Sequence, residues 1–278
     1  MNLGDRIKKR RLELNITQKE LAENICTQSQ ISNIEKNQLT PMSSLLFEIS
    51  NKLHVSMDYL YGKSDENYNF KKVQELFSNL LYKRDYEAIK IALESDIIDE
   101  TTPEKVAYKK YLSSIVLSST VDINKAQELL TEAYELVHTS NNFELLLSII
   151  NAQAILFSKT NDINESKQKL RSAIKLIEDK NYQSEITIKI YHTFTLIEMQ
   201  DKNYKKALQF VNSAIHDSIL IRNSTLLSDL LFDKYILQKK LNINDWDNNH
   251  LISSAYYLAR IEHKSSLVEK IERYIKEV

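Results

Sequence analysis

The stretch TQKELAENICTQSQISNIE, residues 17–35, decides how the N-terminal part of the chain folds. Thr17, followed three residues later by Glu20, forms a capping-box pattern that predicts the start of a helix. Apolar residues then mark the inward faces of two short helices separated by a polar break, first Leu21, Ala22 and Ile25, then Ile31 and Ile34. Two short helices joined tightly predict a helix-turn-helix, although an ordinary amphipathic surface pair shows a similar pattern.

The outer face of the second helix carries groups suited to reading double-stranded DNA. Short amides and hydroxyls reach base edges, while hydroxyls and cations also reach phosphates. We therefore expect the base-reading residues to be Gln28, Ser29, Gln30 and Asn33. We expect phosphate contacts from Thr17, Ser32 and Lys36.

Glycine and proline are scarce, which predicts an all-α protein. The 278 residues include only Gly4 and Gly62, and only two prolines. Phosphate-binding loops, dinucleotide fingerprints and nucleophile elbows need closely spaced glycines, so none of them can be built from this chain. Together with the absence of a recognisable catalytic arrangement, this predicts a protein that binds rather than catalyses.

Cysteine, histidine and apolar residues bear on cofactors and location. Cys26 is the single cysteine, so no internal disulfide can form, and the six histidines show no metal-binding spacing. We expect no metal and no cofactor. The sequence has neither a signal-peptide pattern nor an apolar run long enough to span a membrane, which predicts a cytoplasmic protein with no membrane partner.

Residues 1–64 read as a domain of five short helices. The first helix should bury Leu3, Ile7, Leu12 and Leu14 and place a basic face, Arg6 to Arg11, toward DNA. This region carries nine Lys and Arg against seven Asp and Glu, a net charge of +2. A fourth helix should end near Leu53, and a fifth should run from Ser56 to Gly62. Residues 63–67 form a polar bridge to a second domain, residues 65–278.

Residues 3–63 resemble the Xre-type helix-turn-helix family of repressors. The resemblance rests on Thr17-Gln18-x-x-Leu21-Ala22, Ile31-Ser32-x-Ile34-Glu35 and Leu53-x-Val55-x-x-x-x-Leu60. It implies that Gln18 binds a DNA phosphate and that Arg11 and Glu35 form an ion pair joining the first and third helices. Cys26 stands where these repressors usually have glycine, in a turn one residue shorter. We expect it to be structural, with a redox role as the alternative.

The rest of the chain repeats a two-helix pattern. Small or short residues recur at spacings of 38, 40, 41 and 41, at Ala88, Ala126, Ser166, Ala207 and Asn248. Further small residues lie at fixed offsets from these, at Ser95, Ala133, Ala173, Ala214 and Ala255, and at Ser114, Ala154 and Thr195. Turn-like stretches recur at residues 83–86, 160–163 and 201–204.

This pattern resembles a tetratricopeptide array. The resemblance implies a right-handed α-solenoid of about five helix pairs, closed by a capping helix over residues 265–278. A plain helical bundle is the alternative. In tetratricopeptide units the first helix of each pair lines a concave groove, here by Tyr108, Tyr111, Ser148, Asn151, Lys189, His192 and Asp233, with Ser118, Ser158 and Met199 further along.

The groove lining suits an extended peptide. The amide of Asn151 can hold a peptide backbone, and Lys189 can bind a carboxylate. The alternative is that these side chains simply face solvent.

The complete architecture is similar to the peptide-responsive quorum-sensing regulators of the RRNPP group, in particular its PlcR type. Support comes from Asn24-Ile25-Cys26-x-Gln28-Ser29-x-x-Ser32-x-Ile34-Glu35 and from Asn151-Ala152-x-Ala154. Where the group often has an asparagine in the fourth unit, this chain has His192. The resemblance implies a homodimer on a palindromic operator, whose DNA affinity is controlled by a short signalling peptide in the groove. A ligand-independent dimeric repressor, or a scaffold that sequesters a protein partner, are the alternatives.

Overall fold

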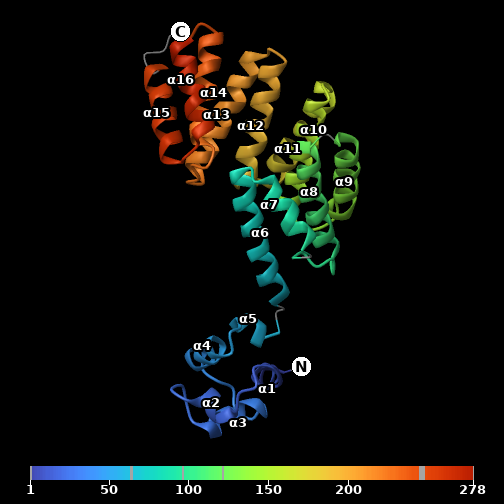
Figure 1. The fold of residues 1–278 in the computed structure, drawn as a ribbon, viewed down its shortest axis with the longest axis vertical. Helices are drawn as coiled ribbons and strands as arrows, with labels where there is room; N and C mark the ends of the chain where they lie inside the picture. Colours follow the sequence, from blue (N-terminus) through green and yellow to red (C-terminus); the bar gives the residue numbers. More distant parts are fainter. Residues whose placement is uncertain (1, 63–64, 96, 121, 244–247, 278) are drawn as a thin grey trace. The chain divides into compact units, whose positions relative to one another are not determined.

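The computed structural model describes residues 2–62, 65–95, 97–120, 122–243 and 248–277. Within these ranges all regular secondary structure is helical, in the order α1 to α16 (Figure 1). The chain divides into two compact units, Met1–Asp85 and Tyr86–Val278. Across the described ranges, no helix combines the length and the apolar character needed to span a membrane.

The N-terminal unit contains the five short helices that the sequence predicts. They are α1 (Leu3–Glu13), α2 (Gln18–Ala22), α3 (Gln28–Glu35), α4 (Ser43–Lys52) and α5 (Met57–Leu60). Their apolar faces meet in one core, made by Ile7, Leu21, Ala22, Ile31, Ile34, Leu46, Ile49, Leu53 and Leu60. The helix α6 (Asp65–Lys83) follows, so residues 65–67 of the expected polar bridge are helical. Residues 63 and 64, and with them the predicted boundary after residue 64, lie outside the described residues.

The predicted buried face of α1 is wrong at one position. Leu12 is 55% exposed, whereas its neighbour Arg11 is buried. Positions four apart share a helix face, so Arg11 lies beside the fully buried Ile7 and Leu12 is rotated away from the core. The apolar residue therefore faces outward and the charged residue faces inward.

Both glycines of the chain meet strict geometric requirements in this unit. A Cβ on Gly4 would lie 2.1 Å from the carbonyl oxygen of Ile34, so only glycine lets α1 approach the end of α3 this closely. The Gly4 amide also donates to Asn37 Oδ1 at 2.9 Å. Gly62 has φ +83°, and a Cβ there would meet the guanidinium of Arg6.

The helix-turn-helix segment begins as predicted, and an asparagine rather than a glycine makes its turn. Thr17 caps α2, because its side chain accepts a hydrogen bond from the Glu20 amide and its own backbone N–H donates to the Glu20 carboxylate. After α2 the chain turns at Asn24, which has φ 64°. Asparagine tolerates this left-handed conformation, so Cys26 does not need to be glycine.

The second unit is built from successive helix pairs. After α7 (Tyr86–Glu94) come α8 (Pro103–Thr120) with α9 (Ile123–Val137), α10 (Phe143–Lys159) with α11 (Ile163–Lys180), α12 (Glu185–Gln200) with α13 (Tyr204–Leu220), and α14 (Leu227–Lys240) with α15 (Asn248–Ile261). Each pair packs together and against the next pair, and α16 (Ser265–Glu277) packs on α15 as the predicted capping helix; residue 278 lies outside the described residues. The unit division falls between α6 and α7, which form the first predicted pair.

Small residues bring the paired helices together, as the repeat pattern predicts. Those at the central positions are buried: Ala126, Ala133, Ser166, Ala173, Ala207, Ala214 and Ala255, with Ser114, Ala154 and Thr195. The contact is direct between α10 and α11, where Ser166 Oγ donates to the carbonyl oxygen of Ala154 at 2.7 Å. Ser95, at the first repeat, is instead exposed. The repeat interpretation is confirmed for the pairs α8 to α15.

Left-handed residues other than glycine end the first helices of the repeats. The predicted turns contain Arg84, Asn161 and Lys202, with φ of 56°, 63° and 58°. In each case one more residue follows, and the next helix then begins. A chain with two glycines thus makes its sharp turns with other residues, for which the left-handed conformation costs about 1 kcal/mol each.

Candidate nucleic-acid interface and candidate ligand groove

The helix α3 presents most of the predicted base-reading side chains to solvent. Gln28, Ser29 and Gln30 are exposed, and Asn33 is half-buried. Gln30 has a second role that the sequence did not predict. Its Oε1 accepts from the Thr27 backbone N–H at 3.1 Å, and its own backbone N–H donates to Thr27 Oγ1 at 3.3 Å. This capping box starts α3, so a base contact through Gln30 Oε1 requires the cap to open.

The predicted phosphate-contacting residues lie in different environments. Thr17 and Lys36 are exposed, and Ser32 is half-buried. The amide nitrogen of Gln18 donates to Glu35 Oε2 at 2.8 Å. Gln18 therefore links the start of α2 to the end of α3, and the second N–H of its side-chain amide is the donor left for a phosphate.

Arg11 and Glu35 form the ion pair that the Xre resemblance implies. Arg11 Nε lies 2.5 Å from Glu35 Oε1, and a second guanidinium nitrogen donates to Glu35 Oε2 at 3.0 Å. Arg11 also donates to the carbonyl oxygen of Ile16 at 2.8 Å. The two side chains are 9% and 2% exposed, and the hydrogen bond to Glu35 raises the pKa of Arg11. Arg11 joins α1 to α3 and does not face DNA.

Two further arginines of the predicted basic face, Arg6 and Arg10, are half-buried and bond to the backbone of other helices. Arg6 donates to the carbonyl oxygen of Leu60 at 3.4 Å, and Arg10 donates to that of Leu53 at 3.2 Å. These bonds hold the ends of α4 and α5 against α1. The exposed cations that remain on α1 are Lys8 and Lys9.

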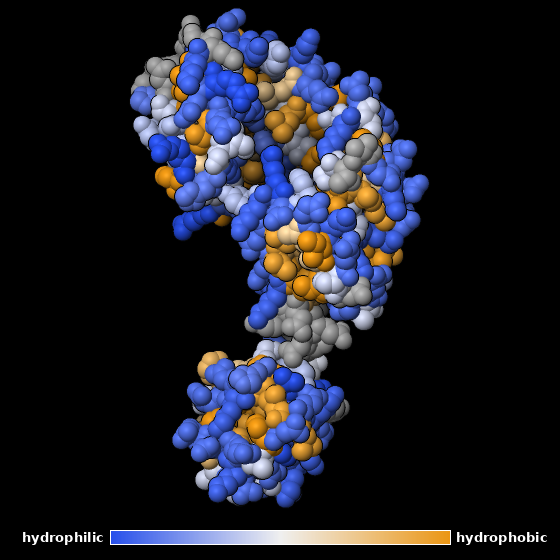
Figure 2. All heavy atoms as spheres, in the orientation of Figure 1, coloured by the Kyte–Doolittle hydropathy of each residue, from blue (hydrophilic) through white to orange (hydrophobic). Residues whose placement is uncertain are grey.

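The second unit contains a cavity of about 190 Å³ that includes four of the predicted groove residues, Tyr111, Ser118, Ser148 and Asn151. It lies among α7, α8, α9 and α10 and is also lined by Tyr86, Ser114, Ile115, Leu130, Ala152, Ile155, Leu156 and Lys159. The repeat pattern gave no sign that α7 and Lys159 contribute to this lining. Figure 2 shows polar and apolar side chains mixed over the visible face of this unit.

Asn151 is the most informative residue of this cavity. Its side chain is 9% exposed, and its Oδ1 atom has no hydrogen-bond partner among the described residues. A buried amide oxygen without a donor costs about 1–3 kcal/mol, so a donor from outside the chain, an ordered water or a ligand, would stabilise it.

Two tyrosines form the aromatic part of the groove. The ring centroids of Tyr108 and Tyr111 are 6.2 Å apart. Burial raises the pKa of Tyr111 to about 12 and raises that of Tyr108 as well. Both phenols therefore keep their protons at neutral pH. Tyr108 is buried and is not one of the residues that line the cavity.

The remaining predicted groove residues lie outside this cavity and are paired within the chain. His192 Nε2 lies 3.0 Å from Asp233 Oδ2, across α12 and α14. Lys189 Nζ lies 2.6 Å from Glu185 Oε1 on its own helix. Asn151, His192 and Asp233 follow one another at intervals of 41 residues and occupy equivalent positions in three units. Of the three, Asn151 carries the unpartnered atom.

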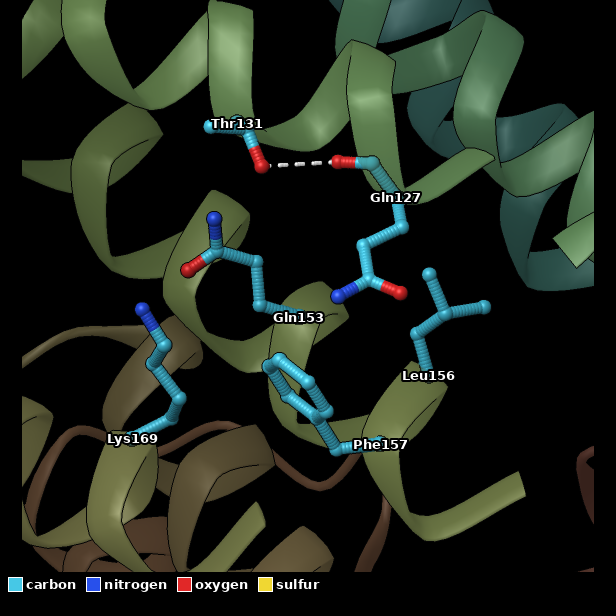
Figure 3. A pocket seen from close by; sticks show the side chains of 6 residues that line it. All are labelled: Gln127, Thr131, Gln153, Leu156, Phe157 and Lys169. Carbon is cyan, nitrogen blue, oxygen red and sulfur yellow. Dashed lines mark hydrogen bonds between the residues drawn. The ribbon is translucent and has the colours of Figure 1, made fainter. Parts of the chain in front are cut away.

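A second, smaller cavity of about 50 Å³ lies among α9, α10 and α11 (Figure 3). The amide of Gln153 and the ammonium of Lys169 turn toward the same space in this view. Gln153 Nε2 donates to the carbonyl oxygen of Leu130 at 3.3 Å, and its Oε1 has no partner among the described residues. A space of this size suits ordered water better than a peptide segment.

Within the described part of the chain, no three histidine, cysteine or acidic side chains gather where a metal ion could bind. Cys26 is half-buried and packs against the core of the N-terminal unit. Burial raises the pKa of its thiol, which disfavours the reactive thiolate. These surroundings fit the structural interpretation of Cys26.

The two units define a helix-turn-helix domain joined to a helical-repeat domain, and comparison with known proteins finds both. A helix-turn-helix family model matches residues 7–60. A model of the RNPP family C-terminal domain matches residues 70–276. The chain therefore belongs to the RNPP family.

Similar proteins share this architecture. The structure resembles Bacillus thuringiensis PlcR in complex with the peptide PapR7 and DNA, with a TM-score of 0.67, 23% identity, and 97% of this chain and 98% of PlcR covered. It also resembles apo ComR from S. thermophilus, with a TM-score of 0.55, 18% identity, and 99% and 98% covered. At these identities the likeness is one of fold. ImmR, a helix-turn-helix transcriptional regulator from Bacillus subtilis, is 39% identical over 66 residues, or 23% of this chain and about half (52%) of ImmR.

Proposed function

We propose that this protein is a transcription regulator that binds DNA through residues 1–64 and is controlled by a short signalling peptide bound in the groove of residues 65–278. The helix-turn-helix, the RNPP domain and the likeness to PlcR, which was solved with a peptide and DNA, support this proposal. The protein would act in the cytoplasm by binding and not by catalysis.

The observation that carries the peptide part of the proposal is the unpartnered Oδ1 of Asn151. A peptide backbone offers N–H donors at regular intervals, and an extended backbone fits a groove between helices. One such N–H bonded to Asn151 would satisfy the buried oxygen. Tyr86, Tyr111 and Ile155 offer apolar contacts in the same cavity.

The proposed DNA contacts come from Gln28, Ser29, Gln30 and Asn33 for bases, and from Thr17, Gln18, Ser32 and Lys36 for phosphates. A homodimer would place two copies of α3 on the two halves of a palindromic operator. Peptide binding would change DNA affinity only to the extent that the peptide prefers one arrangement of the dimer.

The test combines DNA selection with peptide capture, using the full-length protein. A preferred duplex is selected from a random pool, and its affinity is measured with and without the low-molecular-mass peptide fraction of the source organism's medium. Asn33→Ala should abolish sequence preference, while Asn151→Ala should leave DNA binding intact and remove the response to peptide. Asn212→Ala, at an exposed position of α13, is the matched control.

The outcomes separate the alternatives. DNA binding that ignores every peptide fraction would identify a ligand-independent repressor. Absence of any preferred duplex would instead favour a scaffold for a protein partner.

A further inference from the structure

One stripe of α10 carries three different chemical groups in the cavity. Asn151, Ile155 and Lys159 are spaced four residues apart, so they lie on one face of the helix, and all three line the cavity. Eight residues of α-helix span about 12 Å. The stripe therefore offers a hydrogen-bond acceptor, an apolar contact and a cation in sequence along the cavity.

Lys159 is held at the edge of the cavity by the neighbouring repeat. Its Nζ donates to the carbonyl oxygen of Ser118 on α8 at 3.0 Å. An ammonium has three N–H donors, so this bond fixes its position without using its full donor capacity. The cavity lining that the structure describes includes no aspartate or glutamate, which leaves the charge of Lys159 without an opposing carboxylate there.

The middle of the cavity is apolar. Ile155 is 40% exposed, and Ile115 on α8 and Leu130 on α9 line the same space. An aliphatic or aromatic side chain placed here would bury apolar surface on both sides. The order of groups is thus an acceptor for a backbone N–H, a site for an apolar side chain and a site for an anion.

We infer that this cavity binds the C-terminal end of the peptide, with the free α-carboxylate at Lys159 and an apolar last side chain against Ile115 and Ile155. The distance of 12 Å corresponds to about three to four extended residues, counting the last one. The N–H that donates to Asn151 Oδ1 therefore belongs to a residue two or three positions before the C-terminal residue of the peptide. This assignment rests on the proposed function. It adds the direction in which the peptide lies and the chemistry of its end.

The test uses two pools of synthetic hexapeptides that end in leucine and are randomised elsewhere. One pool has free C-terminal carboxylates and the other has C-terminal carboxamides. Each pool is incubated with full-length protein, and bound peptides are identified by mass spectrometry, after which matched acid and amide pairs are titrated. The amide pool also contains internal aspartate and glutamate, so it reports binding through an acidic side chain.

We expect selected acids to bind about ten- to a hundredfold more tightly than their amides, the range for a hydrogen bond to a charged group. Lys159→Gln should remove this difference, and Lys175→Gln, at an exposed position of α11, should preserve it. Lys159 is also exposed, so thermal unfolding should confirm that both variants fold.

Three results would overturn the inference. If acids and amides bind equally and Asn151→Ala abolishes both, the peptide binds in the groove but its carboxylate does not lie at Lys159. Enrichment of internal acidic residues in the amide pool would assign Lys159 to a side chain of the peptide. Failure of both pools to bind a protein that still responds to a natural peptide fraction would overturn this inference alone, whereas the proposed function fails if that fraction has no effect either.

Discussion

Replacing Arg11 by methionine should destabilise the helix-turn-helix unit more than any surface substitution on α1. The change leaves the buried Glu35 carboxylate with the side-chain amide of Gln18 as its remaining partner. Removing one partner of a buried ion pair costs about 3–5 kcal/mol. The double variant Arg11→Met with Glu35→Leu removes the buried charge as well, so it should recover most of this loss.

Hydrogen exchange measured by mass spectrometry on the full-length chain is the appropriate assay, because it reports the two units separately. At 1.36 kcal/mol per factor of ten, Arg11→Met should speed exchange in α1 and α3 by about 10² to 10⁴. Peptides from α10 to α13 should be unchanged and serve as the internal control. Lys9→Met, which removes an exposed charge from α1, is the matched variant. A loss below about 1 kcal/mol in Arg11→Met, or a double variant as unstable as the single, would refute the reasoning.

Three further predictions follow from local geometry. Gly4→Ala should destabilise the N-terminal unit by about 1–3 kcal/mol in the same exchange assay, since its Cβ would lie 2.1 Å from a carbonyl oxygen; unchanged exchange would contradict the close packing. Lys202→Gly should stabilise the repeat unit by about 0.5–1 kcal/mol because Lys202 has φ 58°, whereas Gln209→Gly within α13 should destabilise it, as thermal unfolding can show. Lys105 is the main cause of a pKa of about 2 at Asp99, so wild type should be more stable than Asp99→Asn above about pH 4 and lose that advantage as the pH falls to about 2. An advantage that persisted at lower pH would show that the carboxylate charge is not its source.

The sequence was most informative where the controlling contacts are local. Thr17 and Glu20 predicted the start of α2, and the 41-residue spacing placed the small residues that the repeats bury. The ion pair of Arg11 with Glu35, which only the family resemblance implied, is confirmed. The first two features are determined by neighbours in the sequence or by a periodic pattern, whereas the ion pair joins residues 24 positions apart.

The misses come from contacts between elements far apart in the sequence. No local pattern shows that Arg6 and Arg10 bond to the carbonyl oxygens that end α5 and α4. Leu12 is a different case, because its helical spacing from Ile7 already turns it away from the core. The groove register placed His192 and Asp233 at equivalent positions, yet their pairing depends on the packing of α12 beside α14. Lys159 lies at the cavity because its ammonium donates to a carbonyl oxygen of α8, which no local pattern predicts.

The placement of the two glycines has a consequence for how this protein can diverge. Gly4 and Gly62 both lie in the N-terminal unit, where a Cβ would meet neighbouring atoms. The repeats turn instead at asparagine, arginine and lysine, which many single substitutions can replace at modest cost. Selection can therefore hold the helix-turn-helix nearly fixed while the repeat sequence drifts within its register. A lineage can in this way acquire a new peptide signal without rebuilding its DNA-binding domain.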